Sequence, residues 1–133
     1  MAHHDTLFRE LIDHANRHDA DAIQPYLADD MTFENPLTGP TDKRGMYGFH
    51  GSMWSSFPDL TYHLTNLVTT ADTVVAECTV KGTHQAEMMG IPATHKHLTL
   101  QAAFVAQFKE GKIRRWTSYF DTGTMMRQLG LTK

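Results

Sequence analysis

The second half of the chain contains four long runs in which apolar and polar residues alternate, and this pattern restricts the fold more than any other feature. The runs form two pairs, each around a short turn: Leu60–Thr69 with Thr73–Lys81, and His97–Lys109 with Lys112–Asp121 around Glu110-Gly111. Alternation indicates strands with one buried face, and short turns between such runs indicate antiparallel hairpins. We therefore expect two hairpins in one sheet.

The beginning of the chain shows helical spacing instead. Apolar residues in Leu7–Ala15 recur every three or four positions, which predicts an amphipathic helix that Asp5 can cap. A short second helix is expected to have Asp21 as its N-cap. Pro25 then falls in the first turn, where its missing N–H costs little.

The remaining elements complete an α+β pattern. A first strand is expected at Met31–Asn35, a long helix at Met46–Phe57 that Pro58 ends, and a final short helix at Thr124–Leu129. Helices that precede a run of antiparallel strands pack on one face of the sheet. We expect a curved antiparallel sheet wrapped around about three helices, which leaves a cone with an internal pocket.

Composition narrows the possible partners. The chain has 133 residues, and we expect one domain over residues 1–133. Its 12 basic and 15 acidic residues give a net charge of −3 without a basic stripe, which argues against nucleic acid. Cys78 is the only cysteine, and it falls in an apolar strand where a small core residue is expected. No apolar stretch approaches the ~18 residues of a membrane span, so a cytoplasmic location is expected.

Asp121 is the first candidate for chemistry. It ends the last expected strand, among aromatic and β-branched residues. Apolar walls would raise the pKa of its carboxyl from the ordinary value of roughly 3.9 and make it a proton carrier. Alternation puts Asp121 on one face with Tyr119 and puts Phe120 on the other, and does not decide which face is internal. The alternative is that Asp121 caps the final helix.

His84 is a second candidate, because it follows a glycine at a strand end and can reach the mouth of a pocket. There it could donate to a developing enolate oxygen or shuttle a proton, although a partly exposed, hydrogen-bonded histidine is the commoner case. The loop after it contains Met88 and Met89. Methionines suit an adaptable lid over a pocket, and they suit equally a plug at the end of a core.

Asn35 is a third candidate, two residues after Phe33 on one strand face. If Phe33 faces the core, Asn35 points inward as well, and it could orient the carboxylate or bind a substrate carbonyl. The alternative is a turn residue before Pro36. His95 and His97 could share a metal, but no carboxylate or cysteine completes a ligand set nearby, so no metal is expected. Phosphate-loop, nucleophile-elbow and dinucleotide motifs are all absent from the sequence, so no cofactor is expected.

An ordered set of short motifs resembles the SnoaL-like polyketide cyclases of the nuclear-transport-factor-2-like superfamily. They are Ala28-Asp29-Asp30, Asn35-Pro36-Leu37-Thr38-Gly39-Pro40, Phe57-Pro58-Asp59-Leu60, Gly82-Thr83-His84, Met89-Gly90-Ile91-Pro92-Ala93-Thr94, Lys109-Glu110-Gly111-Lys112-Ile113, Phe120-Asp121 and Gln128-Leu129-Gly130. Together they span nearly the whole chain. The resemblance implies a cone-shaped α+β barrel with a deep apolar pocket, assembled as a homodimer or tetramer through the outer sheet face. It also implies that Asp121 is the general acid/base.

The resemblance leads to one leading hypothesis and two alternatives. The leading hypothesis is cofactor-independent aldol cyclisation or isomerisation of a small hydrophobic carbonyl compound, with catalytic Asp121, His84 and Asn35. The pocket residues expected are Phe33, Phe49, Met53, Trp54, Met88, Met89, Gln101 and Tyr119. The alternatives are a non-catalytic binding module and a subunit-interaction protein, because this fold hosts many functions.

Overall fold

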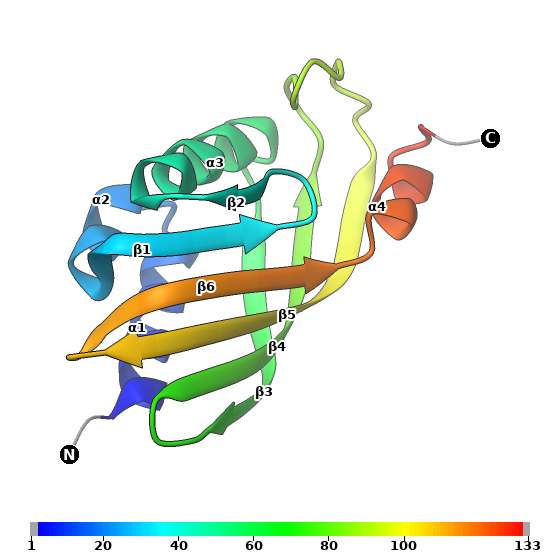
Figure 1. Cartoon of the computed structure of the whole chain (residues 1–133). Coiled ribbons are helices and arrows are strands. Elements are labelled where there is room, and N and C mark those ends of the chain that lie inside the picture. The colour runs from blue at the N-terminus through cyan, green and yellow to red at the C-terminus, as the bar shows by residue number, and fades with distance from the viewer. Residues whose placement is uncertain (1–2, 132–133) are drawn as a thin grey trace.

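The structure of the chain is a computed structural model that describes residues 3–131. The helices are α1 (His4–Asn16), α2 (Ala20–Ile23), the 3-10 helix η1 (Gln24–Tyr26), α3 (Lys43–Ser56) and α4 (Thr122–Gln128). The strands are β1 (Leu27–Asn35), β2 (Gly39–Thr41), β3 (Thr61–Thr69), β4 (Thr73–Thr83), β5 (His97–Lys109) and β6 (Lys112–Phe120). The strands form one curved sheet, with α1 and α3 behind it and α4 at the end of β6 (Figure 1). This is the expected α+β fold.

The sheet runs in the order β2-β1-β6-β5-β4-β3. Both predicted hairpins are confirmed, since β3 pairs antiparallel with β4 and β5 pairs antiparallel with β6. The expectation of a purely antiparallel sheet is wrong, because β1 and β6 are parallel, with Phe33 opposite Trp116. These two strands lie far apart in sequence, and a long connection permits parallel pairing as readily as antiparallel pairing.

Two predicted helix caps are wrong. Helix α1 begins one residue before Asp5, which lies in its first turn, where a negative charge still favours the helix dipole. Helix α2 is capped by Asp19, whose carboxylate accepts a hydrogen bond from the N–H of Ala22 at 3.1 Å. Because α2 therefore starts before Asp21, Pro25 lies in η1 rather than in the first turn of α2.

The core lies between the concave face of the sheet and α1. Phe8 of α1 is fully buried and stacks on Trp116 of β6 with ring centroids 5.1 Å apart. Trp116, Ser118 and Phe120 therefore form the inner face of β6, while Tyr119 points outward and is 57% exposed. The buried contact between α1 and β6 thus fixes which side of the last strand faces the pocket.

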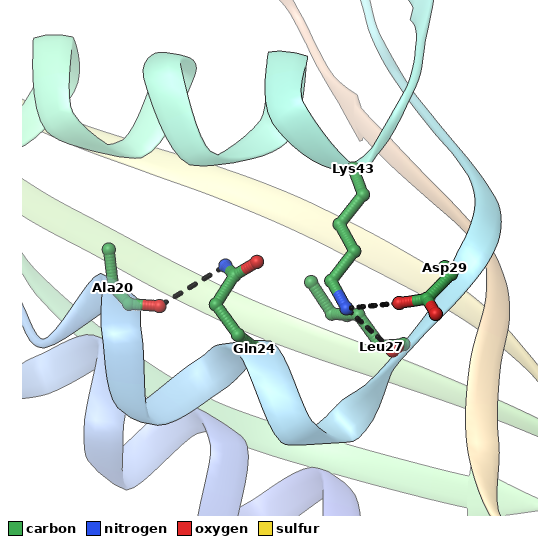
Figure 2. Close-up of polar contacts among 5 residues, drawn as sticks. All are labelled: Ala20, Gln24, Leu27, Asp29 and Lys43. Carbon is green, nitrogen blue, oxygen red and sulfur yellow. Dashed lines mark hydrogen bonds and ion pairs between the residues drawn. The ribbon is translucent and has the colours of Figure 1, made fainter.

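The start of α3 is tied to β1 by polar contacts. Lys43 donates from Nζ to the carbonyl oxygen of Leu27 at 3.1 Å and to the carboxylate of Asp29 at 3.2 Å (Figure 2). Asp42 caps the helix by accepting from the N–H of Gly45 at 2.9 Å. These contacts set where α3 leaves the sheet and so position the side chains that α3 directs at the core.

Within residues 3–131, no helix is both long enough and apolar enough to cross a membrane.

Candidate functional site

An apolar cavity lies between the concave face of the sheet and helices α1 and α3. Its walls are aliphatic and aromatic side chains from α1, α3, α4 and five strands, and the polar lining residues are Asn35, His50, Tyr62 and Ser118. Among the described residues, no Asp, Glu, Lys or Arg lines it. The cavity volume is about 80 Å³, which is small beside the roughly 300–1,000 Å³ typical of drug-sized ligand sites. As it stands, the cavity suits a compact hydrophobic ligand.

Asp121 does not line this cavity, and it caps α4 instead. Its Oδ2 accepts from the backbone N–H of Thr124 at 3.1 Å and from the Thr124 hydroxyl at 2.5 Å. The hydroxyl bond, followed by the backbone bond, lowers the pKa of the Asp121 carboxyl. The expectation of a raised pKa is therefore wrong, because the carboxylate is exposed and hydrogen-bonded rather than held against apolar walls.

Asp121 is nevertheless close in sequence to residues that line the cavity. Phe120, the residue before it, lines the cavity, and so does Met125 on the first turns of α4. Asp121 follows the inner face of β6 in sequence, but alternation directs its exposed side chain away from the side that Phe120 faces, so the carboxylate must reorient before it can reach the cavity.

Asn35 lies in the cavity wall and is 3% exposed. Its Oδ1 accepts from the N–H groups of Leu37 at 2.8 Å and Thr38 at 3.0 Å, so the side chain closes the turn after β1. Its Nδ2 has no hydrogen-bond partner in the part of the chain that the structure describes. Asn35 therefore has both features that the sequence suggested. Its Oδ1 stabilises the turn around Pro36, and its Nδ2 is an unpaired donor in the cavity wall.

His84 is fully buried but does not line the cavity. Its ring stacks on Phe57 with centroids 5.2 Å apart, and its Nδ1 accepts from the N–H of Thr94 at 3.2 Å. Burial lowers the pKa of His84, so the neutral ring is favoured. The expected position at a pocket mouth is wrong, because the loop that follows folds back over the histidine.

Several expected pocket residues lie elsewhere. Gln101 and Tyr119 are on the outer face of the sheet, where the Gln101 side-chain oxygen accepts from the Thr79 hydroxyl at 3.2 Å. Met88 is buried outside the cavity lining, and Met89 is 51% exposed. These four predictions are therefore wrong. For Gln101 and Tyr119, alternation along the strand did not decide which face is internal; for Met88 and Met89, the composition of a loop does not determine its conformation.

The other four expected pocket residues surround or support the cavity. Phe33, Phe49 and Met53 line it. Trp54 lies behind the lining and donates from Nε1 to the hydroxyl of Tyr62 at 3.0 Å. Whether any of them contacts a substrate stays a prediction.

Three polar lining residues were missed from the sequence: His50, Tyr62 and Ser118. Burial raises the pKa of Tyr62, so its phenol stays neutral, and burial lowers the pKa of His50 to about 4. A pattern in the sequence pointed to His50: it lies four residues after Met46 and four before Trp54, which is the spacing of one helix face. A histidine among buried apolar positions of a helix is a candidate pocket residue.

Comparisons with known proteins agree with this architecture. IdmH of Streptomyces antibioticus, a candidate polyketide cyclase, is 27% identical, covers 95% of this chain and 97% of its own, and superposes with a TM-score of 0.83. AclR of Streptomyces galilaeus, a candidate hydroxylase, is 22% identical over 97% and 96% of the two chains, with a TM-score of 0.87. A SnoaL-like polyketide cyclase from Agrobacterium tumefaciens is 22% identical over 98% and 100%, with a TM-score of 0.82. No curated protein matches the chain.

The sequence itself matches one family, SnoaL-like polyketide cyclase, over residues 5–129. That range runs from the first turn of α1 to the residue after α4 and so includes every strand of the sheet and the whole cavity. The chain therefore belongs to the SnoaL-like polyketide cyclase family.

Proposed function

We propose that this protein is a cofactor-independent acid/base enzyme that cyclises or isomerises a small hydrophobic carbonyl compound in the cavity. The observation that carries this proposal is the Nδ2 of Asn35, which has no partner within residues 3–131 and lies in a mostly apolar wall. A buried donor without a partner costs about 1–3 kcal/mol, and a carbonyl oxygen on a ligand would remove that cost. The family membership and the candidate cyclase IdmH support the same reaction class.

In this proposal Asp121 is the general base. Its carboxylate turns from Thr124 and removes a proton from the carbon next to the substrate carbonyl, whose oxygen becomes an enolate held by Asn35. The enolate carbon then forms a C–C bond to a second carbonyl carbon, the C=O π bond of that carbonyl breaks, and protonated Asp121 returns its proton to the new alkoxide. The product is an isomer of the substrate, so no cofactor enters the balance.

The test reaction is the intramolecular aldol cyclisation of 2-(3-oxobutyl)cyclohexanone, followed by NMR as the diketone becomes its ketol. We expect a rate above that of buffer and of heat-inactivated protein. A rate equal to buffer, together with no binding of the diketone, would reject the proposal.

Asn35→Asp should weaken binding of this diketone by about tenfold or more. Aspartate keeps an oxygen that accepts from Leu37 and Thr38, so the turn survives, but it replaces the Nδ2 donor with an acceptor that repels a carbonyl oxygen. Isothermal titration calorimetry measures the change, and circular dichroism checks the fold. Unchanged affinity would show that Asn35 does not hold the carbonyl.

A non-catalytic binding module is the second candidate function, and the absence of a carboxylate from the described cavity lining favours it. The same experiment separates the two. A binding module binds the diketone in the cavity and leaves its cyclisation rate at the buffer value. An enzyme binds the diketone and also raises its cyclisation rate above that value.

We also propose that two copies associate through the outer face of the sheet. Val75 is 39% exposed there and pairs with Val105, and Tyr119, 57% exposed, pairs with Ala103, so apolar side chains lie on the outer face of β4, β5 and β6. Light scattering should give twice the mass of one chain, and Tyr119→Lys should shift the protein towards the mass of a single chain. A wild-type protein with the mass of one chain at micromolar concentration would contradict this assembly.

A further inference from the structure

His50 is held in the cavity by aromatic rings on several sides. It stacks on Trp54 with centroids 4.9 Å apart and planes 9° from parallel, and it meets the edge of Phe33 at 6.0 Å. Phe49 lies 6.2 Å away. Packing of this kind fixes the plane of the imidazole, so its ring nitrogens point in set directions rather than sampling many.

His50 lines the cavity and is half-buried, and no side chain of residues 3–131 forms a hydrogen bond with its ring. The described cavity lining contains no Asp, Glu, Lys or Arg; Tyr62 of β3 is its other ionisable residue, and His18 also stacks on Trp54. Burial in these surroundings keeps the pKa of His50 at about 4, so the imidazole is neutral at pH 7. A neutral imidazole carries one N–H donor and one acceptor nitrogen.

Asn35 and His50 both line the cavity near Phe33. Phe33 contacts His50, and Asn35 is two residues further along β1 on the same face of the sheet. Residues i and i+2 of a strand are about 6.5–7 Å apart. The Asn35 Nδ2, which is buried and unpaired among residues 3–131, and the half-buried His50 ring therefore both belong to the lining near Phe33, in a cavity whose other lining groups are mostly apolar.

We propose that His50 is a catalytic residue whose neutral imidazole donates its N–H to the second carbonyl oxygen of the substrate, the carbonyl that the enolate attacks. This assignment rests on the proposed function and extends it. As the C–C bond forms, negative charge collects on that oxygen, and the fixed N–H stabilises it without becoming a charged acid. The imidazole keeps its proton, so the proton that completes the alcohol still comes from Asp121.

The proposal defines the substrate class as a compound with two carbonyl oxygens, one for Asn35 and one for His50. A ligand with only one carbonyl leaves one donor unpaired and should bind less tightly. The ratio of the affinities for a compound with two carbonyls and a compound with one therefore measures the contribution of His50 to binding.

The experiment compares two ligands of similar size, 2-(3-oxobutyl)cyclohexanone and 2-butylcyclohexanone, by calorimetry at pH 7. We expect wild-type protein to bind the diketone about tenfold more tightly than the monoketone, which corresponds to one hydrogen bond. His50→Phe keeps an aromatic ring against Trp54 but removes the N–H, and it should abolish the preference and slow cyclisation. His50→Gln retains an N–H donor and should restore part of both.

Met53→Leu is the matched control, since Met53 lines the cavity one turn after His50 without a hydrogen-bonding group. It should change the affinities for both ketones alike. Two results would overturn the assignment to His50 while leaving the proposed function standing. The first is an equal preference for the diketone in wild type and His50→Phe, and the second is equal binding of both ketones by wild type. Binding of neither ketone by wild type would instead reject the proposed function, and the role of His50 with it.

Discussion

Replacing Asp121 with asparagine should lower the rate constant of cyclisation by about 10²–10⁴-fold, the usual contribution of one positioned base. Asparagine cannot take a proton from carbon at neutral pH. It is, however, as good a helix N-cap as aspartate, and its oxygen can still accept from the N–H of Thr124. We therefore expect the free energy of unfolding to change by less than about 1 kcal/mol.

The matched control for this variant is Asp42→Asn, which makes the same substitution at the N-cap of α3. Kinetics with the diketone and urea unfolding should show an activity loss for Asp121→Asn alone. A full cyclisation rate in Asp121→Asn would mean that the carboxylate is only a cap. Equal losses of stability and activity in both variants would mean that capping, rather than proton transfer, explains the effect.

The lowered pKa of Asp121 adds a prediction about the pH profile of this reaction. Hydrogen bonds from Thr124 keep the carboxylate ionised at lower pH than an ordinary aspartate. The Asp121 carboxyl is therefore fully ionised at neutral pH, and the rate of cyclisation should not fall as the pH decreases from 8 towards 5. A carboxyl with a raised pKa would instead lose activity over that range.

The second large effect concerns stability in acid. The pKa of His50 is about 4 in the folded protein, against 6.5 for an ordinary histidine. Between these values the unfolded chain binds a proton that the folded chain does not, so stability is highest above pH 6.5 and falls as the pH decreases towards 4. At 1.36 kcal/mol per pKa unit, the loss is at most about 3 kcal/mol, and it is smaller to the extent that water reaches the half-buried ring.

Urea unfolding of wild type and His50→Phe at pH 7 and pH 4.5 measures this contribution. Wild type should lose more stability than the variant between the two values, because phenylalanine does not titrate. Met53→Leu, which changes the same cavity without changing an ionisable group, should behave like wild type. Parallel losses in wild type and His50→Phe would show that His50 is hydrated enough to protonate in the folded protein.

The sequence predicts those parts of the fold that depend on neighbouring residues. Both hairpins follow from alternation and short turns, and they are present. The parallel pairing of β1 with β6 joins segments about 80 residues apart, and no local pattern encodes it. The inner face of β6 is decided by the packing of Trp116 against Phe8, a contact between the two ends of the chain.

The same distinction applies to the candidate site. Asn35 was found because Phe33 marks the inner face of its own strand. Tyr119 and Gln101 were misplaced because alternation alone gives two equivalent faces. The sequence left two interpretations of Asp121 open, a carboxyl in apolar surroundings and a helix cap. The structure shows the cap, so the rise in the Asp121 pKa that was expected from apolar surroundings does not occur.

The cap at Asp121 has a mechanical consequence if that carboxylate is the base. Both hydrogen bonds from Thr124 go to Oδ2, so proton transfer to Oδ2 would release the first turn of α4, whereas Oδ1 has no hydrogen-bond partner among residues 3–131. The other end of α4 stays fixed, because Gln128 exchanges two hydrogen bonds with the backbone of Thr99, at 2.7 and 2.8 Å. If the cap is released, the N-terminal end of α4 can move while Gln128 holds its C-terminal end. Met125, which lines the cavity, would move with α4 and widen a cavity that is too small for a large substrate while the cap is closed.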